Sequence, residues 1–360
     1  MSAISDLSVA SANSNYFVTS RREEALSSDK NRIFLCDEKV KAQAMQMLGG
    51  DFPWIIVKAS EELKTLESCA LILEEMAVNG ANRDSQLVAI GGGAVQDIAT
   101  LVASLYMRGI DWLYVPTTLM AMMDSCIGGK SSINVGKFKN LVGNYNAPTS
   151  IYINVAFSST LSPEDISCGV AEGAKICFAA GSDSFLLFVS LIEKWRESGS
   201  EEDLGEAIFL SLSKKKWFIE RDEFDRNERK LLNFGHSFGH ALEASTSFTV
   251  PHGIAVLIGM EAALIKAQVG AVTSALANFI RAEVVHSCFD SRKITIDEKV
   301  FLAALEKDKK NSFDLLNLIL PQSDGALAVT SFPLTQEELK ECLSSTREAL
   351  SELGIDNEVL

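Results

Sequence analysis

Histidine is scarce in this chain, and the scarcity makes each position informative. Only four of the 360 residues are histidine, and three of those lie between Leu232 and Met260. Cysteine is sparse as well: the seven cysteines are scattered, odd in number and without a Cys-x-x-Cys pair. This pattern is typical of reduced thiols in a cytoplasmic protein.

Basic residues are fewer than acidic ones. The 33 lysines and arginines against 48 acids give a formal charge of −15, which would repel a nucleic-acid duplex or an anionic membrane. Long apolar runs are missing because charged residues such as Asp97, Glu261 and Lys266 interrupt them, which argues against a membrane span. The polar first twenty residues lack the apolar core of a secretory signal, and nothing repeats at a fixed period.

Hydrophobic patterning predicts two domains after a polar lead-in of residues 1–30. In residues 31–160, short apolar runs alternate with helical patterns, which indicates an α/β domain with a parallel sheet. In residues 161–360 the apolar spacing becomes three and four, which predicts an all-α second domain.

A run of three glycines marks the first candidate site. Gly91, Gly92 and Gly93 follow an apolar strand pattern and precede a helical one. Strand, glycines and helix together bring backbone amides against a pyrophosphate, although a tight turn without ligand also explains them, and the Gly-x-Gly-x-x-Gly spacing is not met. Asp37 ends another strand, where it could accept hydrogen bonds from a ribose or simply end the strand in a turn.

A glycine- and lysine-containing loop forms the second candidate. Residues 124–130 place two glycines before Lys130, and Lys139 and Asn140 follow nine residues later. Such a loop is costly to order without a ligand, so we interpret it as an anion-binding loop, with a flexible lid as the alternative.

The histidine-rich stretch forms the third. His236 and His240 are four residues apart, with Asn233 and Glu243 three residues outside them, so one helix would bring all four to one face. Imidazoles on such a face suit a divalent metal, and His252 could close the site. Two histidines that merely line a polar groove remain the alternative.

Seven motifs, in this order, resemble the sugar phosphate cyclases and within them the 3-dehydroquinate synthase family, over residues 36 to 320. They are Gly-Gly-Gly-Ala-Val-Gln-Asp at 91–97, Pro-Thr-Thr-Leu at 116–119, Asp-Ser-Cys-Ile-Gly-Gly-Lys at 124–130, Lys-Asn-Leu-Val-Gly at 139–143, Ala-Glu-Gly-Ala-Lys at 171–175, Asn-Phe-Gly-His-Ser-Phe-Gly-His-Ala at 233–241 and Asp-Lys-Lys at 308–310.

This resemblance implies a Rossmann-like NAD-binding α/β domain, a helical C-terminal domain and an active site in the cleft between them. It implies a catalytic zinc, or another divalent metal such as Co²⁺, bound by Glu172, His236 and His252. His240 would then act on the substrate or in proton transfer rather than as a ligand. The family is commonly homodimeric.

The implied reaction is that of a phosphate-eliminating lyase of the shikimate pathway, which leads to the aromatic amino acids. The substrate is a seven-carbon keto sugar acid phosphate (DAHP). Its alcohol is oxidised transiently by bound NAD, phosphate leaves by β-elimination, NADH returns the hydride, and an intramolecular aldol step gives 3-dehydroquinate.

The resemblance also assigns the remaining site residues. Those expected around the small anionic substrate are Asp124, Lys130, Asn140, Lys175, Lys215, Arg229, Asn233, His240 and Lys309. Those expected around NAD are Asp37, Glu61, Lys64, Gly91, Gly92, Gly93, Asp97, Thr117, Thr118 and Lys139.

Several positions depart from the family's usual residues. The chain has Gln96 and Thr100 at positions where glycine is common, and Ile254 where a glutamate usually follows His-Gly. It also has Asp225 where glutamate is usual, Lys39 where asparagine is usual and Asn154 where aspartate is usual.

Three alternative functions stay open: a sibling cyclase acting on another sugar phosphate, a metal-dependent polyol dehydrogenase, and a catalytically silent paralogue.

Overall fold

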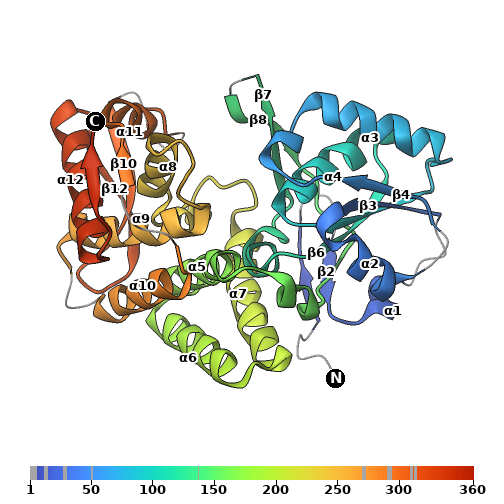
Figure 1. Cartoon of the computed structure of the whole chain (residues 1–360), viewed down its shortest axis with the longest axis horizontal. Coiled ribbons are helices and arrows are strands. Elements are labelled where there is room, and N and C mark those ends of the chain that lie inside the picture. Colours follow the sequence, from blue (N-terminus) through green and yellow to red (C-terminus); the bar gives the residue numbers. More distant parts are fainter. Residues whose placement is uncertain are drawn as a thin grey trace. The chain divides into compact units, whose positions relative to one another are not determined.

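The chain is represented by a computed structural model that forms two compact units (Figure 1). Unit 1 comprises Met1–Leu161 and Lys194–Glu223, and unit 2 comprises Ser162–Glu193 and Phe224–Leu360. The residues that the structure describes are 6–11, 15–26, 31–49, 52–136, 138–269, 273–289, 294–308, 311 and 314–360. The second predicted domain, 161–360, therefore differs from unit 2, since Lys194–Glu223 groups with the first unit.

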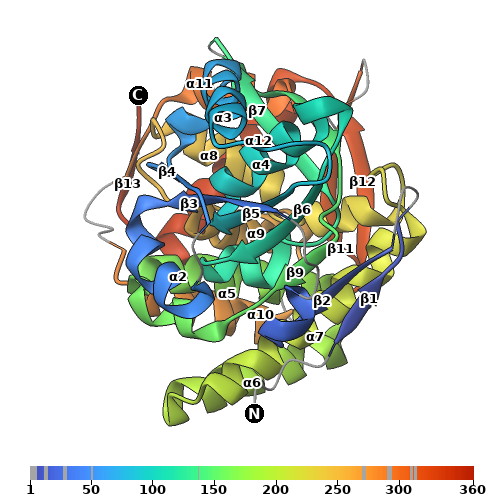
Figure 2. The same cartoon turned by 90° about the vertical axis from the view of Figure 1, so that its right-hand side faces the viewer.

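Unit 1 is built on a sheet whose strand order is β1-β2-β9-β6-β5-β3-β4. All its neighbours are parallel except β1 and β2, and Figure 2 shows β3, β5 and β6 side by side. The strands are β1 (Leu7–Val9), β2 (Tyr16–Thr19), β3 (Arg32–Asp37), β4 (Trp54–Val57), β5 (Gln86–Gly91), β6 (Asp111–Pro116) and β9 (Ser150–Tyr152). Because β3 and β5 are buried throughout, their sequences are continuous apolar runs.

Helices and a separate hairpin complete unit 1. The hairpin is formed by β7 (Lys130–Val135) and β8 (Phe138–Tyr145). The helical segments are α1 (Arg22–Ala25), η1 (Glu38–Val40), α2 (Lys41–Leu48), η2 (Glu61–Leu63), α3 (Leu66–Val78), α4 (Gly93–Leu105), η3 (Tyr106–Arg108), the π-helical η4 (Ala121–Ser125), η5 (Val155–Thr160) and α7 (Glu201–Arg221).

The prediction that residues 1–30 form a loose lead-in is wrong for the part of this segment that the structure describes. Residues 16–19 form β2, which pairs in parallel with β9, and Tyr16 and Val18 are buried. A strand of four residues flanked by polar ones carries too little periodicity to stand out in the sequence.

Unit 2 is mainly helical. Its helices are α5 (Pro163–Ala179), η6 (Glu228–Asn233), α8 (His236–Ser245), α9 (His252–Ala267), α10 (Ser274–His286), α11 (Glu298–Glu306) and α12 (Gln336–Glu352), while α6 (Ser182–Ser198) begins in unit 2 and ends in unit 1. Ser162 caps α5 by accepting a hydrogen bond from the Asp165 amide, and Pro163 occupies its first turn. Residues 254–263 of α9 are all buried.

The expectation that this half is all-α is only partly right. Strands β11 (Leu315–Pro321) and β12 (Leu327–Pro333) pair antiparallel, and β10 (Ile294–Ile296) pairs with β13 (Asn357–Val359). Short apolar runs do not distinguish strand from helix by spacing, which explains the omission. In the part of the chain that the structure describes, no helix is long and apolar enough to span a membrane.

Candidate active site

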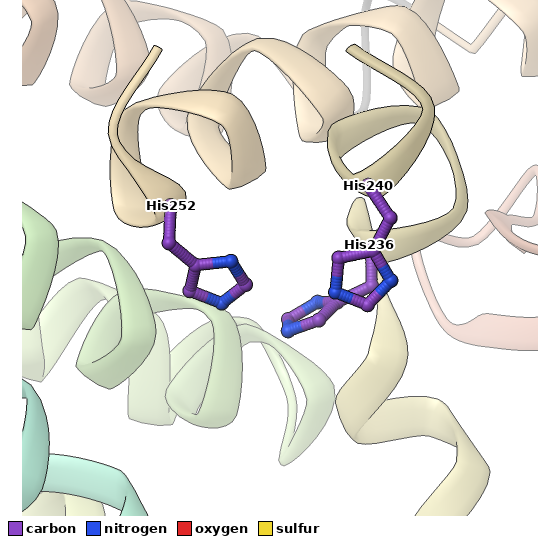
Figure 3. A group of neighbouring side chains, drawn as sticks. All are labelled: His236, His240 and His252. Carbon is purple, nitrogen blue, oxygen red and sulfur yellow. The ribbon is translucent and has the colours of Figure 1, made fainter. Parts of the chain in front are cut away.

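Four side chains from three helices of unit 2 meet at one point. Glu172 lies on α5, His236 and His240 on α8, and His252 begins α9. The carboxylate oxygen Oε1 of Glu172 is 3.3 Å from Nε2 of His252 and 3.7 Å from Nε2 of His236. One ring nitrogen from each of the three histidines lies within 4.8 Å of the others, and Figure 3 shows their rings facing a common space.

For His236 and His252, hydrogen bonds fix which ring nitrogen faces this space. Nδ1 of His236 is 3.2 Å from the carbonyl oxygen of Phe234, which can only accept a hydrogen bond, so this nitrogen carries the proton. Nδ1 of His252 is 3.2 Å from Oε2 of Glu243. When both rings are neutral, as metal binding requires, the lone pair resides on Nε2, the atom directed at Glu172. An acid and two imidazoles oriented in this way fit a divalent metal such as zinc.

The spacing of Glu243 predicted that it shares a helix face with His236 and His240, but it predicted no function for this residue. In the structure, the Glu243 carboxylate contacts the imidazole of His252. Ile254, which stands where the family usually has a glutamate, is fully buried and apolar. Glu243 therefore supplies His252 with a carboxylate partner, which the side chain of Ile254 cannot provide.

The charge state of His252 follows from its neighbours. Burial lowers the pKa of its imidazole, but hydrogen bonds and charge interactions with Glu172 and Glu243 together raise that pKa to about 10. A carboxylate pair around one imidazole thus attracts positive charge to this point. A bound divalent cation would satisfy the same attraction.

Two glycines allow helices α5, α8 and α9 to pack closely around the site. Gly235, with φ +76°, precedes α8, and a Cβ there would lie 2.8 Å from the carbonyl oxygen of Val256 on α9. At Gly253 a Cβ would lie 2.3 Å from Cα of Cys168 on α5. Larger residues at either position would separate the helices that carry Glu172, His236 and His252.

The predicted substrate residues Lys175, Arg229 and Asn233 lie on α5 and η6 of unit 2, and the predicted position of Asn233 needs a correction. Lys175 is buried and forms an ion pair with Glu172, and Arg229 is buried on η6. Asn233 ends η6 and donates to the carbonyl oxygen of Lys230, so it does not share a helix face with His236 and His240 as the spacing predicted. The positive φ of Gly235 ends the continuity, because helical geometry cannot pass through a left-handed residue.

In unit 1 five of the predicted dinucleotide residues lie at the carboxyl ends of β5 and β6, namely Gly91, Gly92, Gly93, Thr117 and Thr118. Gly91 pairs with Pro116 across the two strands, and the amide of Thr117 donates to the carbonyl oxygen of Gly91. A Cβ at Gly92 would meet the side chain of Thr118 at 2.9 Å, whereas at Gly93 it would face open space. Gly93, the first residue of α4, is exposed, and an exposed glycine at a helix N-terminus fits a pyrophosphate.

Lys64 connects three further predicted residues. Its ammonium is 3.0 Å from Oδ2 of Asp97, 2.9 Å from Oδ1 of Asn140 and 3.5 Å from Oε1 of Glu61. Burial raises the pKa of Asp97, and the charge of Lys64 opposes that rise. Asp37 is also buried, and its Oδ1 accepts hydrogen bonds from the amides of Lys39 and Ala59.

The loop that carries Asp124 is held by α7. Lys215 forms an ion pair with the Asp124 carboxylate and donates to the carbonyl oxygens of Asp124 at 2.6 Å and of Ile127 at 3.1 Å. Lys130 begins β7 and Lys139 lies on β8, and both are exposed. Lys309 lies outside the described residues, although its neighbour Asp308 accepts a hydrogen bond from the Ser237 hydroxyl on α8.

Comparison with known sequences identifies the family. The family described as 3-dehydroquinate synthase N-terminal matches residues 54–168, and 3-dehydroquinate synthase C-terminal matches residues 169–311. A 3-dehydroquinate synthase of Sulfurovum sp. (strain NBC37-1) is 36% identical over 279 residues, which cover 77% of this chain and 78% of that protein.

Solved structures of related cyclases share the fold. A 2-deoxy-scyllo-inosose synthase complexed with carbaglucose-6-phosphate, NAD⁺ and Co²⁺ matches with a TM-score of 0.79 at 22% identity, covering 96% of this chain and all of that one (100%). A 2-epi-5-epi-valiolone synthase from Streptomyces hygroscopicus subsp. jinggangensis 5008, with NAD⁺ and Zn²⁺ bound, matches with a TM-score of 0.77 at 22% identity, covering 94% and 98% of the two chains. By sequence, this chain belongs to the 3-dehydroquinate synthase family.

Proposed function

We propose that this protein is a 3-dehydroquinate synthase, which converts the seven-carbon keto sugar acid phosphate to 3-dehydroquinate and inorganic phosphate. The observation that carries the proposal is the convergence of Glu172, His236 and His252, from three helices, in a chain of this family. The buried Lys175 beside them adds a cation suited to an anionic substrate.

The proposed cofactors are NAD and a divalent metal, zinc or cobalt. The two related cyclases were crystallised with NAD⁺ and with Co²⁺ or Zn²⁺. Glu172, His236 and His252 would hold the metal, and the turn at Gly91–Gly93 with Lys64 and Asp97 would hold the dinucleotide. When bound, the dinucleotide accepts and returns a hydride while the metal polarises a substrate oxygen.

The chain's own residues would bind the substrate and move its protons. In unit 2, the guanidinium of Arg229 can grip a carboxylate or phosphate through two parallel hydrogen bonds, and Asn233 offers a neutral amide. His240, which has a ring nitrogen near those of His236 and His252, would hold or release a proton. In unit 1, Asp124, Lys130, Asn140 and Lys215 are the proposed substrate residues, as is Lys309 in unit 2.

A panel of sugar phosphates tests the substrate. The chain should turn over the seven-carbon keto acid phosphate and ignore hexose and heptulose phosphates that lack the carboxylate. We expect kcat/KM to differ by more than about 1,000-fold, because a ligand without the carboxylate cannot form the charged hydrogen bonds proposed for it. Preference for a sugar phosphate without a carboxylate would instead make it a sibling cyclase. Accumulation of NADH from a simple polyol would make it a dehydrogenase, and no turnover at all would make it a silent paralogue.

The setting of the reaction is also part of the proposal. We expect the enzyme to act as a homodimer in the cytoplasm, in the pathway to the aromatic amino acids. Sedimentation of the purified protein tests the dimer, and growth of an aromatic auxotroph that lacks this step tests the pathway.

A further inference from the structure

The side chain of Gln96 is a buried polar group whose amide nitrogen and oxygen both have hydrogen-bond partners. It lies on α4, next to the predicted dinucleotide residue Asp97, and is only 3% exposed. Its Nε2 donates to the carbonyl oxygen of Ser125 at 2.7 Å, and its Oε1 accepts from the Ser125 hydroxyl at 2.7 Å. One carboxamide thus satisfies the backbone and the side chain of the same residue.

The residue held in this way is Ser125, which directly follows Asp124 at the end of η4. The next residue on α4, Asp97, accepts a hydrogen bond from the amide of Ser132 at 3.2 Å. Consecutive residues of α4 therefore hold both ends of a segment that contains Lys130. Between these ends, Gly128 and Gly129 both have positive φ, so the segment has little stiffness of its own.

Other contacts also hold this part of the chain, but none of those described next involves Ser125. The Gly128 amide donates to the hydroxyl of Tyr16 at 2.8 Å, and Lys215 binds the carbonyl oxygens of Asp124 and Ile127. Thr100, the second position where glycine is common in the family, donates its hydroxyl to the carbonyl oxygen of Gln96 at 2.7 Å. The two departures on α4 thus form one hydrogen-bonded chain from Thr100 through Gln96 to Ser125.

We propose that Gln96 is a positioning residue, which fixes the loop of residues 124–130 on α4 and thereby sets the orientation of Asp124 and Lys130 toward the substrate. A glycine at this position leaves the Ser125 hydroxyl and carbonyl without these partners. The proposal rests on the proposed function only where it assigns Asp124 and Lys130 to substrate; the attachment of the loop to α4 is independent of it.

Gln96→Met tests the proposal, because methionine keeps most of the volume and removes both hydrogen bonds. Hydrogen exchange of the amides of residues 122–132 should accelerate by about tenfold in the variant, since loss of a buried hydrogen-bonded pair favours local opening. Gln86→Met is the matched control. Gln86 is also buried in unit 1, at the first residue of β5, where it accepts from Nε of Arg32 at 3.2 Å and donates to the Thr149 hydroxyl at 3.4 Å. Its exchange in residues 122–132 should stay at the wild-type rate.

Kinetics separate positioning from a general loss of structure. With Gln96→Met, kcat/KM for the seven-carbon phosphate should fall by about tenfold, while the dissociation constant of NAD changes less than about twofold, because the glycine turn is untouched. Ser125→Ala, which removes one of the two hydrogen bonds with little loss of packing, should show a smaller change in the same direction, and it serves as the test if Gln96→Met does not fold.

Unchanged exchange of residues 122–132 in the folded Gln96→Met and Ser125→Ala proteins would overturn the proposal. Equal exchange changes in Gln86→Met would also overturn it, by showing a general effect. If wild-type protein proves inactive on every sugar phosphate, the proposed function fails, but the exchange measurement still decides whether Gln96 holds the loop.

Discussion

Oε2 of Glu243 lies 3.2 Å from Nδ1 of His252, and this pair orients the imidazole so that Nε2 faces Glu172. Carboxylate partners of this kind fix the tautomer of a metal-binding histidine and raise its basicity. The structure thus gives His252 a supporting acid from α8 in a chain that has Ile254 on α9.

Glu243→Ala should weaken metal binding by about 10- to 100-fold without abolishing it, because the three ligands remain. Competition with a chelator of known zinc affinity measures the change. Glu348→Ala, an exposed glutamate on α12, serves as the control. Equal zinc affinity in the Glu243 and Glu348 variants would show that the Glu243 contact has no role at a metal.

His252→Ala and His240→Ala should separate ligand from proton carrier. Their ring nitrogens both lie in the histidine cluster, so proximity alone does not distinguish them. We expect His252→Ala to lose bound zinc, and His240→Ala to retain one zinc per chain while kcat falls by about 100-fold or more. Elemental analysis of the purified variants decides, and loss of zinc from His240→Ala would make that residue a ligand.

Lys64→Met should raise the dissociation constant of NAD by about tenfold, because it leaves Asp97 and Asn140 without their shared cation. Isothermal titration measures it. The exposed Lys58, at the end of β4, provides the control as Lys58→Met. If NAD binds the Lys64 variant as tightly as wild type, the dinucleotide residues of unit 1 are wrongly assigned.

The ion pairs of Lys266 should stabilise α9 against α12 in a pH-dependent way. Its Nζ lies 2.7 Å from Oε1 of Glu338 and 2.5 Å from Oε2 of Glu341. Burial lowers the pKa of Lys266, but the hydrogen bonds and charges of these acids outweigh it and raise the pKa above 10.5. The stabilisation is therefore complete below pH 10.5 and disappears as the pH rises through the folded-state pKa.

Lys266→Met accordingly should lower the free energy of unfolding by about 1 kcal/mol at pH 8, with a smaller difference at pH 11. Urea unfolding at the two pH values measures this, and Lys340→Met is the control because its side chain is 62% exposed and 4.0 Å from Glu298. If the difference in unfolding free energy between wild type and Lys266→Met grew with pH, the ion pairs of Lys266 would not be the source of the stabilisation.

The sequence predicted the central strands well and the short peripheral ones poorly. β3, β5 and β6 carry apolar runs because both faces are covered, whereas β2 and β12 are short or half-exposed and depend on partners far along the chain. Segment Lys194–Glu223 has a helical sequence pattern that does not distinguish it from the helices of unit 2. Only tertiary contacts group it with unit 1.

The candidate site shows a similar division. Spacing alone pointed to His236, His240 and His252, but Glu172 lies on a different helix and only the family resemblance named it. No local pattern indicated that Glu243 would reach His252 across the turn between α8 and α9, or that Gln96 would meet Ser125, since both pairings depend on how separate elements pack.

The most direct test is to follow phosphate and NADH together while the zinc-loaded protein, supplied with NAD, acts on the seven-carbon keto acid phosphate. We expect steady release of one phosphate per 3-dehydroquinate formed, with no net NADH. Phosphate release that does not require NAD, or NADH that accumulates with product, would contradict it.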